Sequence, residues 1–397
     1  MKILVMDWPA FGIETIKDIF SELGHEVSVF EFPHKLPEAK NGEELCIKIV
    51  NKIMSLQIDM VFSFNFFPVI ATAAHACRCP YVSWVYDSPA VYLYSMTVFF
   101  PENHIFHFDS AEVQRMRRDG VEHVYYLPLA ANVKSYDSME PDMEQRKRYT
   151  ADIAMIGSLY GEKYSYFDRY TGFDDHMRGF FDGLVNAQEQ LYGINVLEEA
   201  LTPQIMKQLL KVVPLAENKG DEYDTPAWAF ANYYLAMRVT EQERRHILEA
   251  LSEHYDVALY TGSQVTGLDR VRNMGSAEYY HEAPFAIKCA KINLNVTLKS
   301  IQAGIPLRCM DILGCGGFLL SNYQTDLCTE FVPDEDFVFY ESKEDAVDKA
   351  GYYLTHDEER CRIAQSGYQK AKRYHNFRRK CRDILKTVFS DAEQRSE

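Results

Sequence analysis

The sequence predicts an α/β fold of two doubly wound domains with parallel sheets, joined by a linker. Short apolar runs alternate with amphipathic stretches of helical length from residue 2 to about residue 127. The stretch 132–150 is polar and lacks periodicity, and the alternation restarts at residue 152. Such alternation is typical of parallel strands joined by helices. We predict domains at 1–133 and 151–372, a linker at 134–150, and a C-terminal helix at 373–397 that packs back on the first domain.

The first domain is expected to open with a Rossmann-like β-α-β unit. An apolar run at 2–6 reads as a buried strand, and an amphipathic helix then extends to Leu23. A second strand follows at 26–30, but no G-x-G-x-x-G is present, which argues against a nicotinamide dehydrogenase. Later strands are expected at 59–63, 81–86, 104–108 and 123–127, and helices at 43–56, 69–77 and 111–118, the last capped by Ser110.

The second domain is expected to contain a helical insertion at about 165–250, rich in Tyr, Phe and acidic residues. Two stretches of it, 197–213 and 241–251, have clear amphipathic spacing. The other expected elements are strands at 152–156, 255–261, 277–280, 291–296, 318–320 and 337–340, and helices at 345–354 and 357–374. A basic run at 373–386 is interpreted as a solvated helix face.

Composition excludes several classes of protein. The chain has 397 residues, 47% of them apolar, which is enough for two or three packed domains. A net charge of −16 argues against broad nucleic-acid binding. The nine cysteines are scattered, and no second pair completes a zinc site with the Cys77-x-Cys79 pair. With no apolar run of membrane-spanning length and no signal peptide, we expect a cytoplasmic protein without an integral membrane segment, compatible with a homodimer.

One stretch, 304–327, is a candidate ligand site. Arg308 and Asp311 are three residues apart and share a face of an expected helix. Gly316 and Gly317 end that helix, and an apolar strand and a polar loop follow. Ligands of open α/β sheets bind at such strand and helix ends, so a charged, hydroxyl-bearing ligand is expected here. The alternative is a core helix followed by a core strand.

The chain resembles a known family in this same stretch. Two Rossmann-like halves, a linker and a final helix form the layout of GT-B glycosyltransferases, whose two domains face a cleft. The C-terminal part, about 295–385, is similar to the CgeB-type (spore maturation protein-like) glycosyltransferases. The matching segments are NVT at 295–297, GIPLR at 304–308, DILGCGGF at 311–318, DL at 326–327, Phe331 and HNFRR at 375–379, with WVYDSP at 84–89, FD at 108–109, YLPLA at 126–130 and IGSLY at 156–160 upstream.

The resemblance implies roles for individual residues. Retaining GT-B relatives carry an E-x7-E motif whose last Glu binds the nucleotide ribose, and Asp311 stands at that position. The first Glu falls at Ala303, which departs from the pattern, and Gln302 is its neighbour. Asp87 follows the position where relatives often have a His, so it is expected to orient an acceptor hydroxyl or take its proton. The alternative for Asp87 is that it only begins the turn before Pro89.

The donor site implied by the resemblance lies at strand ends and uses no metal or other cofactor. Gly157 and Ser158 offer backbone N–H groups to the diphosphate, while Lys163 and Arg308 offer positive charge. A uracil or similar base is expected to contact residues 260–263. The backbone of Gly316 and Gly317 is expected to approach the phosphates. The expected donor residues are Gly157, Ser158, Lys163, Tyr260, Thr261, Gly262, Ser263, Asn295, Thr297, Arg308, Asp311, Gly316 and Gly317, and the expected catalytic residues are Asp87 and Arg308.

The expected function is therefore transfer of a hexose-like sugar from a nucleotide donor, by resemblance UDP-linked, with retention of configuration. The acceptor is a protein, a glycan or a small molecule. Two alternatives stay open: a GT-B-shaped protein that binds a ligand or partner without turnover, motivated by the missing first Glu, and a GT-B nucleotide-sugar epimerase, which needs no acceptor.

Overall fold

The computed structural model describes residues 1–34, 42–161, 172–213 and 222–394, and it divides into two compact units. The N-terminal unit comprises Met1–Asn132, Asn218–Tyr223 and His375–Glu397. The C-terminal unit comprises Val133–Glu217 and Asp224–Tyr374. Each unit is described by itself.

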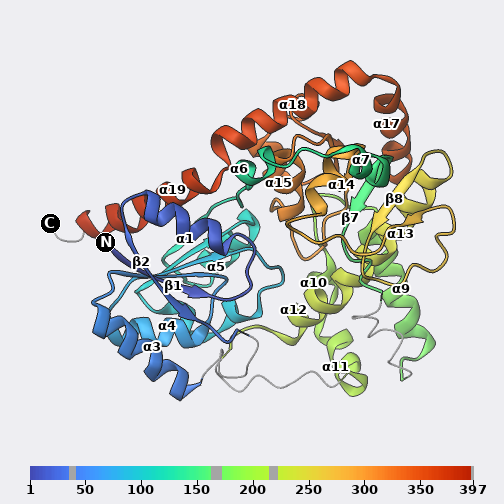
Figure 1. Cartoon of the computed structure of the whole chain (residues 1–397). Coiled ribbons are helices and arrows are strands. Elements are labelled where there is room, and N and C mark those ends of the chain that lie inside the picture. Colours follow the sequence, from blue (N-terminus) through green and yellow to red (C-terminus); the bar gives the residue numbers. More distant parts are fainter. Residues whose placement is uncertain (35–41, 162–171, 214–221, 395–397) are drawn as a thin grey trace. The chain divides into compact units, whose positions relative to one another are not determined.

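The N-terminal unit is built on a six-stranded parallel sheet in the order β2-β1-β3-β4-β5-β6. The central strands are buried on both faces, as a parallel sheet requires. Figure 1 shows α1 and α19 on one side of this sheet and α3 and α4 on the other. The strands are β1 (Lys2–Asp7), β2 (Glu26–Glu31), β3 (Met60–Phe64), β4 (Tyr81–Val85), β5 (Asn103–His107) and β6 (Val124–Tyr126), and the helices are α1 (Ile13–Glu22), α3 (Glu43–Leu56), α4 (Pro68–Cys77), η1 (Val91–Tyr94), η2 (Met96–Phe99), α5 (Ser110–Arg118) and α19 (Phe377–Gln394).

Helix α19 packs on α1 within the N-terminal unit, at the glycine that precedes α1. Gly12 has a φ of 85°, and a Cβ there would lie 2.6 Å from the Phe377 ring. Only glycine combines this backbone conformation with so close a contact. The C-terminal helix is thus fixed to the first βα turn of the chain.

The C-terminal unit has a second six-stranded parallel sheet, in the order β12-β11-β10-β7-β8-β9. Alternation along β8 sends Val257 and Leu259 to a core shared with α13 (Ala236–Ser252), α17 and α18. It sends Ala258 and Tyr260 to a core shared with α7 and α14. The strands are β7 (Ala151–Ile156), β8 (Val257–Tyr260), β9 (Arg272–Asn273), β10 (Ala290–Asn295), β11 (Leu319–Asn322) and β12 (Val338–Tyr340), and the helices are α6 (Val133–Asp137), α7 (Met143–Tyr149), α14 (Ala283–Cys289), α15 (Leu307–Gly314), α16 (Thr325–Glu330), α17 (Lys343–Thr355) and α18 (Asp357–Tyr374).

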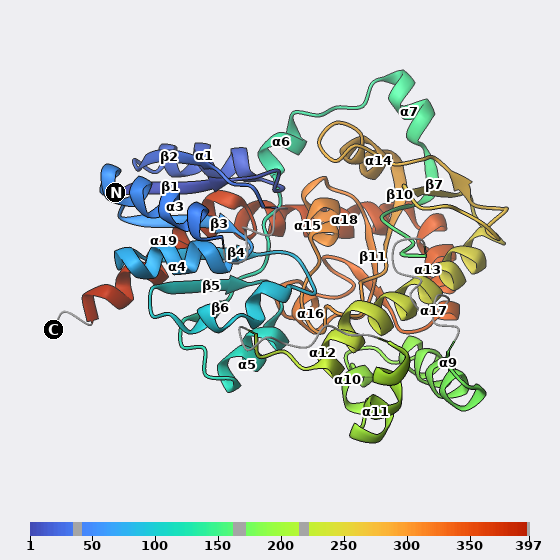
Figure 2. The ribbon, with the colours of Figure 1, turned by 90° about the horizontal axis from the view of Figure 1, so that it is seen from below.

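Between β7 and β8 lies the helical insertion, in which no strand occurs among the described residues. It has an apolar core of its own, centred on buried side chains such as Phe181, Leu209 and Phe230. Figure 2 shows α9 to α12 gathered together, with α13 leading away from them. The elements are α9 (Asp175–Glu189), α10 (Leu197–Ala200), α11 (Pro203–Val212), α12 (Pro226–Phe230), a π-helical turn η3 (Ala231–Leu235) and α13 (Ala236–Ser252).

The structure confirms two parallel, doubly wound halves and corrects four local predictions. The stretch expected to be an aperiodic linker contains α6 and α7, and α7 is capped by an Asp142–Gln145 capping box. The helix expected at 197–213 is broken, because Pro203 starts a new helix after the Thr202 cap. No strand forms at 277–280; the sixth strand is β9 instead. The cap of α5 is Asp109, whose carboxylate accepts the Ala111 N–H, and not Ser110.

Among the described residues, no helix is both long enough and apolar enough to cross a membrane.

Candidate functional site

Each sheet has one topological switch point. The chain first adds strands on one side of its first strand and later adds the remaining strands on the other side. In the N-terminal unit the switch point lies between β1 and β3, and in the C-terminal unit between β7 and β10. Ligands of open α/β sheets bind outside the carboxyl ends of the strands at such points. A ligand site is therefore expected at the carboxyl edge of each sheet, the edge at which its parallel strands end.

Arg244 of α13 spans the switch point of the C-terminal sheet. Its guanidinium donates to Val296 O, after β10, through Nε at 3.1 Å, and to Ser158 O, after β7, through Nη1. The side chain is buried, with the residue 8% exposed, and lies over the Tyr160 ring. A Cβ on Gly157 would lie 3.3 Å from Nη1, so a glycine at this strand end makes room for the arginine. Arg244 thus fixes the two loops that border the switch point.

Four predicted residues, Gly157, Ser158, Gly262 and Ser263, do meet at this edge. Ser158 Oγ and Ser263 Oγ are 3.3 Å apart, and the Leu159 N–H donates to Ser263 Oγ at 3.0 Å. Ser158 and Gly262 are exposed, and Gly157 and Ser263 are half-buried. The ends of β7 and β8 therefore form one accessible polar edge.

Tyr260 and Thr261, predicted to contact the base, are buried. The Tyr260 side chain turns into the core with its ring 6.1 Å from that of Tyr149, and burial raises its pKa to about 12. Thr261 is 4% exposed and accepts the Ser263 N–H at 3.1 Å. Neither presents an open surface to a base.

Asn295 and Thr297 are also buried, in a network of their own. Asn295 Nδ2 donates to Thr297 Oγ1 at 3.0 Å and to Ser321 Oγ at 2.9 Å. The Thr297 N–H donates to Asn322 Oδ1 at 2.8 Å. These bonds hold the β10 and β11 ends together, which is a positioning role in this structure.

Asp311 lies on α15 at the centre of a closed cluster. Its Oδ1 accepts hydrogen bonds from the hydroxyls of Tyr136 and Tyr279, both at 2.8 Å, and Arg308 Nη1 lies 3.2 Å from Oδ2. Asp311 is 2% exposed, whereas the Arg308 side chain is 23% exposed. Burial raises the pKa of the Asp311 carboxyl, and Arg308 and the two tyrosines oppose that shift. The predicted Arg308–Asp311 pair exists, but the carboxylate is fully engaged by protein donors.

Gly316 and Gly317 lie between α15 and the start of β11, at the opposite edge from Gly157 and Ser158. Gly316 has the positive φ, 77°, that closes a helix. A Cβ on Gly317 would lie 2.7 Å from Asn293 Nδ2 and 2.8 Å from Ile287 Cγ2. Chain reversal and close packing explain both glycines, and they lie away from the edge formed by Gly157 and Ser158, so their approach to the phosphates stays a prediction. Lys163 lies outside the described residues.

Asp87 stands at the carboxyl edge of the N-terminal sheet, after β4. Asn65, after β3, donates through Nδ2 to Asp87 Oδ2 at 2.6 Å, and its Oδ1 accepts the Tyr86 N–H at 3.0 Å. Asp87 is exposed by surface area, yet desolvation raises the pKa of its carboxyl and the Asn65 hydrogen bond opposes the shift. A carboxylate fixed by an amide in this way can accept a hydrogen bond from a bound hydroxyl.

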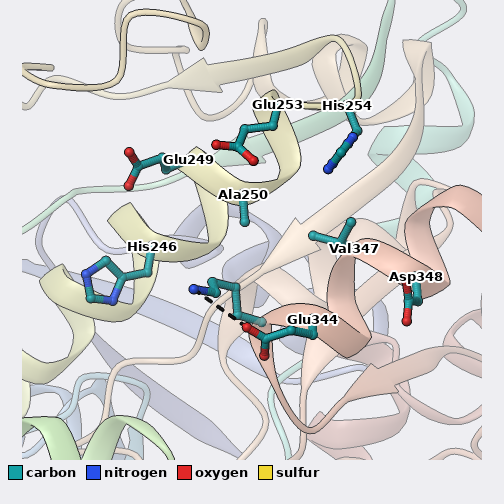
Figure 3. Close-up of a pocket in the computed structure, with 9 residues that line it drawn as sticks. His246, Glu249, Ala250, Glu253, His254, Glu344, Val347 and Asp348 are labelled. Carbon is teal, nitrogen blue, oxygen red and sulfur yellow. Dashed lines mark ion pairs between the residues drawn. The ribbon is translucent and has the colours of Figure 1, made fainter.

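A pocket of about 460 Å³ lies elsewhere in the C-terminal unit, between α13 and α17. Figure 3 shows that acidic groups and two histidines surround it, among them Glu249, Glu253, His246 and His254. Within the described part of the chain, no group of three or more His, Cys, Asp or Glu side chains has a geometry that could hold a metal ion. None of the predicted donor or catalytic residues lines this pocket.

Sequence reasoning missed Arg244, Tyr136 and Tyr279. Arg244 sits in an amphipathic helix whose charges look solvated, and Tyr136 lies in the stretch interpreted as a linker. Only the fold brings these residues to Ser158 and Asp311, so no spacing along the chain indicates them. The only feature of the sequence that hints at Arg244 is Gly157. A glycine directly after a predicted strand indicates that another group packs closely against the backbone there.

Comparisons with known proteins agree with this architecture. Residues 242–386 match the family model described as glycosyl transferase-like. Among solved structures, a glycosyltransferase of Rickettsia africae ESF-5 is similar with a TM-score of 0.53 and 10% identity, over 98% of this chain and 97% of that chain. HepE of Anabaena in complex with UDP and glucose has a TM-score of 0.54 and 11% identity, over 100% and 99% of the two chains. Sucrose-phosphate synthase of Thermosynechococcus elongatus has a TM-score of 0.52 and 11% identity, over 98% and 100%.

At these identities the similarity concerns the fold. A search of curated proteins finds no match. The two parallel six-stranded sheets with their helices confirm the α/β, GT-B-like class. The chain thus has the fold of the GT-B glycosyltransferases, and its C-terminal part matches a glycosyl transferase-like family model.

Proposed function

We propose that this protein is a glycosyltransferase that moves a sugar from a UDP-linked donor to an acceptor hydroxyl, with retention of configuration and without a metal ion. The family match over residues 242–386 carries the proposal, because that stretch contains Arg244, Ser263 and Asp311. The UDP and glucose in the HepE complex support the choice of donor. The CgeB-type resemblance, the acceptor (a protein, a glycan or a small molecule) and a cytoplasmic location belong to the proposal as well.

The proposed donor site is the carboxyl edge of the C-terminal sheet. The Gly262 N–H and the hydroxyls of Ser158 and Ser263 are proposed to face the diphosphate, whereas the Gly157 N–H is already bonded to Tyr260 O at 3.0 Å. Arg308 supplies positive charge, and we keep Lys163 in the same role. The proposed donor site has fewer residues than the sequence predicted. Tyr260, Thr261, Asn295 and Thr297 are buried, so they support the strand ends and do not face the donor.

Asp311 is proposed as the ribose ligand by exchange of hydrogen bonds. Its Oδ1 accepts two tyrosine hydroxyls, from Tyr136 and Tyr279, in the absence of a ligand. A ribose hydroxyl offers the same O–H donor, so it can replace one tyrosine without leaving the buried carboxylate unpaired. The raised pKa of Asp311 makes a donor-rich surrounding necessary for its charged form.

The reaction requires few protein groups. The acceptor oxygen forms a bond to the anomeric carbon on the same face from which the diphosphate departs, as retention in one displacement requires. The bond from that carbon to the diphosphate oxygen breaks, and the nucleoside diphosphate leaves with the electron pair. The acceptor proton passes to the Asp87 carboxylate, which Asn65 holds in place. Arg308, the Gly262 N–H and the hydroxyls of Ser158 and Ser263 stabilise the charge that develops on the leaving diphosphate.

Thermal shift with nucleotides tests the donor assignment. A ligand present at 100 times its Kd stabilises the folded state by about 2.7 kcal/mol. We expect UDP and UDP-glucose to raise the melting temperature with no added metal and in the presence of EDTA, and ADP and GDP to raise it less. We also expect slow hydrolysis of the preferred UDP-sugar. Equal, negligible shifts with all nucleotides would exclude the proposal.

A second candidate function, ligand binding without turnover, is favoured by one observation. Asp311 is closed by three protein donors, and Ala303 stands where the first Glu of the motif is expected. This candidate predicts UDP binding with neither hydrolysis nor transfer for any UDP-sugar. Product detection over a long incubation separates the two.

A further inference from the structure

Aromatic side chains collect at the switch point of the N-terminal sheet. Trp8 follows β1, and its Nε1 donates to Phe64 O of β3 at 3.2 Å, across the switch point. The Trp8 ring centroid lies 4.7 Å from His34, 5.8 Å from Phe67 and 6.1 Å from Tyr86, with the Tyr86 ring nearly parallel. These rings come from the ends of four different strands, so only the folded sheet assembles them.

The cluster has a buried base and an accessible surface. Trp8 is 9% exposed and Phe67 4%. Phe11, whose ring centroid lies 6.2 Å from that of Tyr86, is 41% exposed. Tyr86 and His34 are half-buried. We call Trp8, Phe11, His34, Phe67 and Tyr86 the aromatic platform.

Polar groups border the aromatic platform and set the charge of its ligand. Asp87 follows Tyr86 directly in the chain and is fixed by Asn65. Asp7, at the end of β1, accepts from Lys17 Nζ at 3.0 Å, and Lys17 also pairs with Glu14 at 2.6 Å. Lys17 is therefore already shared by two carboxylates. The carboxylates of Asp7 and Asp87 would repel an anionic ligand, whereas a neutral ligand meets no such repulsion.

The ligand that fits is neutral, rich in hydroxyls, and apolar on one face. The faces of aromatic rings carry negative charge density and attract the weakly positive C–H groups of a ligand. Carboxylate and amide side chains accept and donate hydrogen bonds to hydroxyls. A pyranose ring combines both features: its C–H groups point from one face, and its hydroxyls point outward. Ligand sites that pair aromatic walls with a few polar groups have this composition.

We propose that the aromatic platform binds a pyranose ring of the acceptor, so that the acceptor is a glycan or a glycoside and one of its hydroxyls lies at Asp87. This inference rests on the proposed glycosyltransferase function. It narrows the acceptor to one chemical class and gives Phe11 and Tyr86 a binding role. Asp87 then accepts the proton of a ring hydroxyl as the new glycosidic bond forms.

The test measures binding and transfer separately. Methyl pyranosides (β-glucoside, β-galactoside, α-mannoside) and cellobiose are titrated by calorimetry in the presence of saturating UDP, and each is then offered as acceptor with the UDP-sugar that is hydrolysed fastest. We expect saturable binding of at least one pyranoside and a product that contains it. Sorbitol, which has the hydroxyls but no ring, is expected not to bind.

The substitution Phe11→Ala tests whether the pyranoside binds at the aromatic platform. Loss of the exposed ring is expected to raise the Kd and the KM for the pyranoside about tenfold, equivalent to about 1.4 kcal/mol, with UDP-sugar hydrolysis unchanged. Phe99→Ala is the matched control, because Phe99 is 37% exposed in the same unit and its ring lies beside Tyr223. It should leave both constants as in the wild type.

The outcomes distinguish this inference from the function on which it rests. Intact UDP-sugar hydrolysis with no pyranoside binding, with equal binding of sorbitol, or with an unchanged Kd in Phe11→Ala overturns the inference alone. Absence of both UDP binding and hydrolysis in the wild type overturns the proposed function first.

Discussion

The two sheets of this protein share a topology and differ in the chemistry at their switch points. In the C-terminal unit, Arg244 spans the switch point, and the carboxylate of Asp311 on α15 is enclosed by two tyrosines. In the N-terminal unit, aromatic rings line the switch point and the carboxylate, Asp87, is exposed. The first arrangement is polar and held together by a buried arginine, and the second presents ring faces beside a carboxylate. Under the proposed function, the first serves the charged donor and the second the neutral acceptor.

The largest effect is expected when the enclosed carboxylate of Asp311 is removed. Asp311→Ala should abolish UDP-sugar hydrolysis and transfer, because it removes the proposed ribose ligand, while the fold survives with a stability loss on the order of 2 kcal/mol from the unpaired tyrosines and Arg308. Product formation and urea unfolding measure the two effects. Asp336→Ala is the control, since Asp336 is also buried (5% exposed), accepts from Ser366 and Lys370, and lies at the amino edge of the sheet. Unchanged turnover in Asp311→Ala would refute the assignment.

Substitution of the exposed carboxylate, Asp87, is expected to lower the rate of transfer without changing the binding of UDP. Asp87→Asn should lower the rate of transfer about 100-fold, because the amide cannot take the acceptor proton, and should leave the UDP-induced thermal shift unchanged. Asp59→Asn is the control at the opposite edge of the same sheet, where Asp59 accepts the Lys2 N–H. Equal transfer rates in the wild type and in Asp87→Asn would mean that Asp87 only starts the turn before Pro89.

Arg244 should matter for stability as well as for the donor. Arg244→Met leaves the carbonyls of Val296 and Ser158 without their buried donor, so we expect a loss of about 3 kcal/mol in the free energy of unfolding and a weaker UDP-induced shift. Arg245→Met, the next residue on α13, removes a more exposed side chain and should cost less. Equal losses in the two variants would show that Arg244 has no special role at the switch point.

The smallest expected effect concerns the pH response of the N-terminal unit. Burial raises the pKa of Glu112 to about 7, and the hydrogen bond from Tyr94 OH at 2.6 Å opposes the shift. Because the folded-state pKa exceeds the unfolded value of about 4.5, the stability linked to the neutral carboxyl is present at low pH. It is lost as the pH rises through 7.

Glu112→Gln should remove this dependence, with a change on the order of 2 kcal/mol between pH 5 and pH 8. Unfolding free energies at several pH values measure it. Parallel pH profiles for the wild type and the variant would mean that Glu112 is ionised throughout.

Sequence patterns alone predict the two α/β halves, most element positions and the polar edge at Gly157, Ser158, Gly262 and Ser263. These follow from local periodicity and from glycine and serine at strand ends, which act over a few residues. They also single out the Arg308–Asp311 pair, because residues three apart on a helix are neighbours.

The surroundings of those residues depend on how the folded chain packs. Tyr136 lies 175 positions from Asp311, and the rings of the aromatic platform come from four strand ends. Gly316 and Gly317 serve packing at the far edge, since the chain crosses the sheet between Asp311 and β11. Local patterns specify elements, whereas the enclosure of a carboxylate depends on residues that meet only when the sheets and helices have packed.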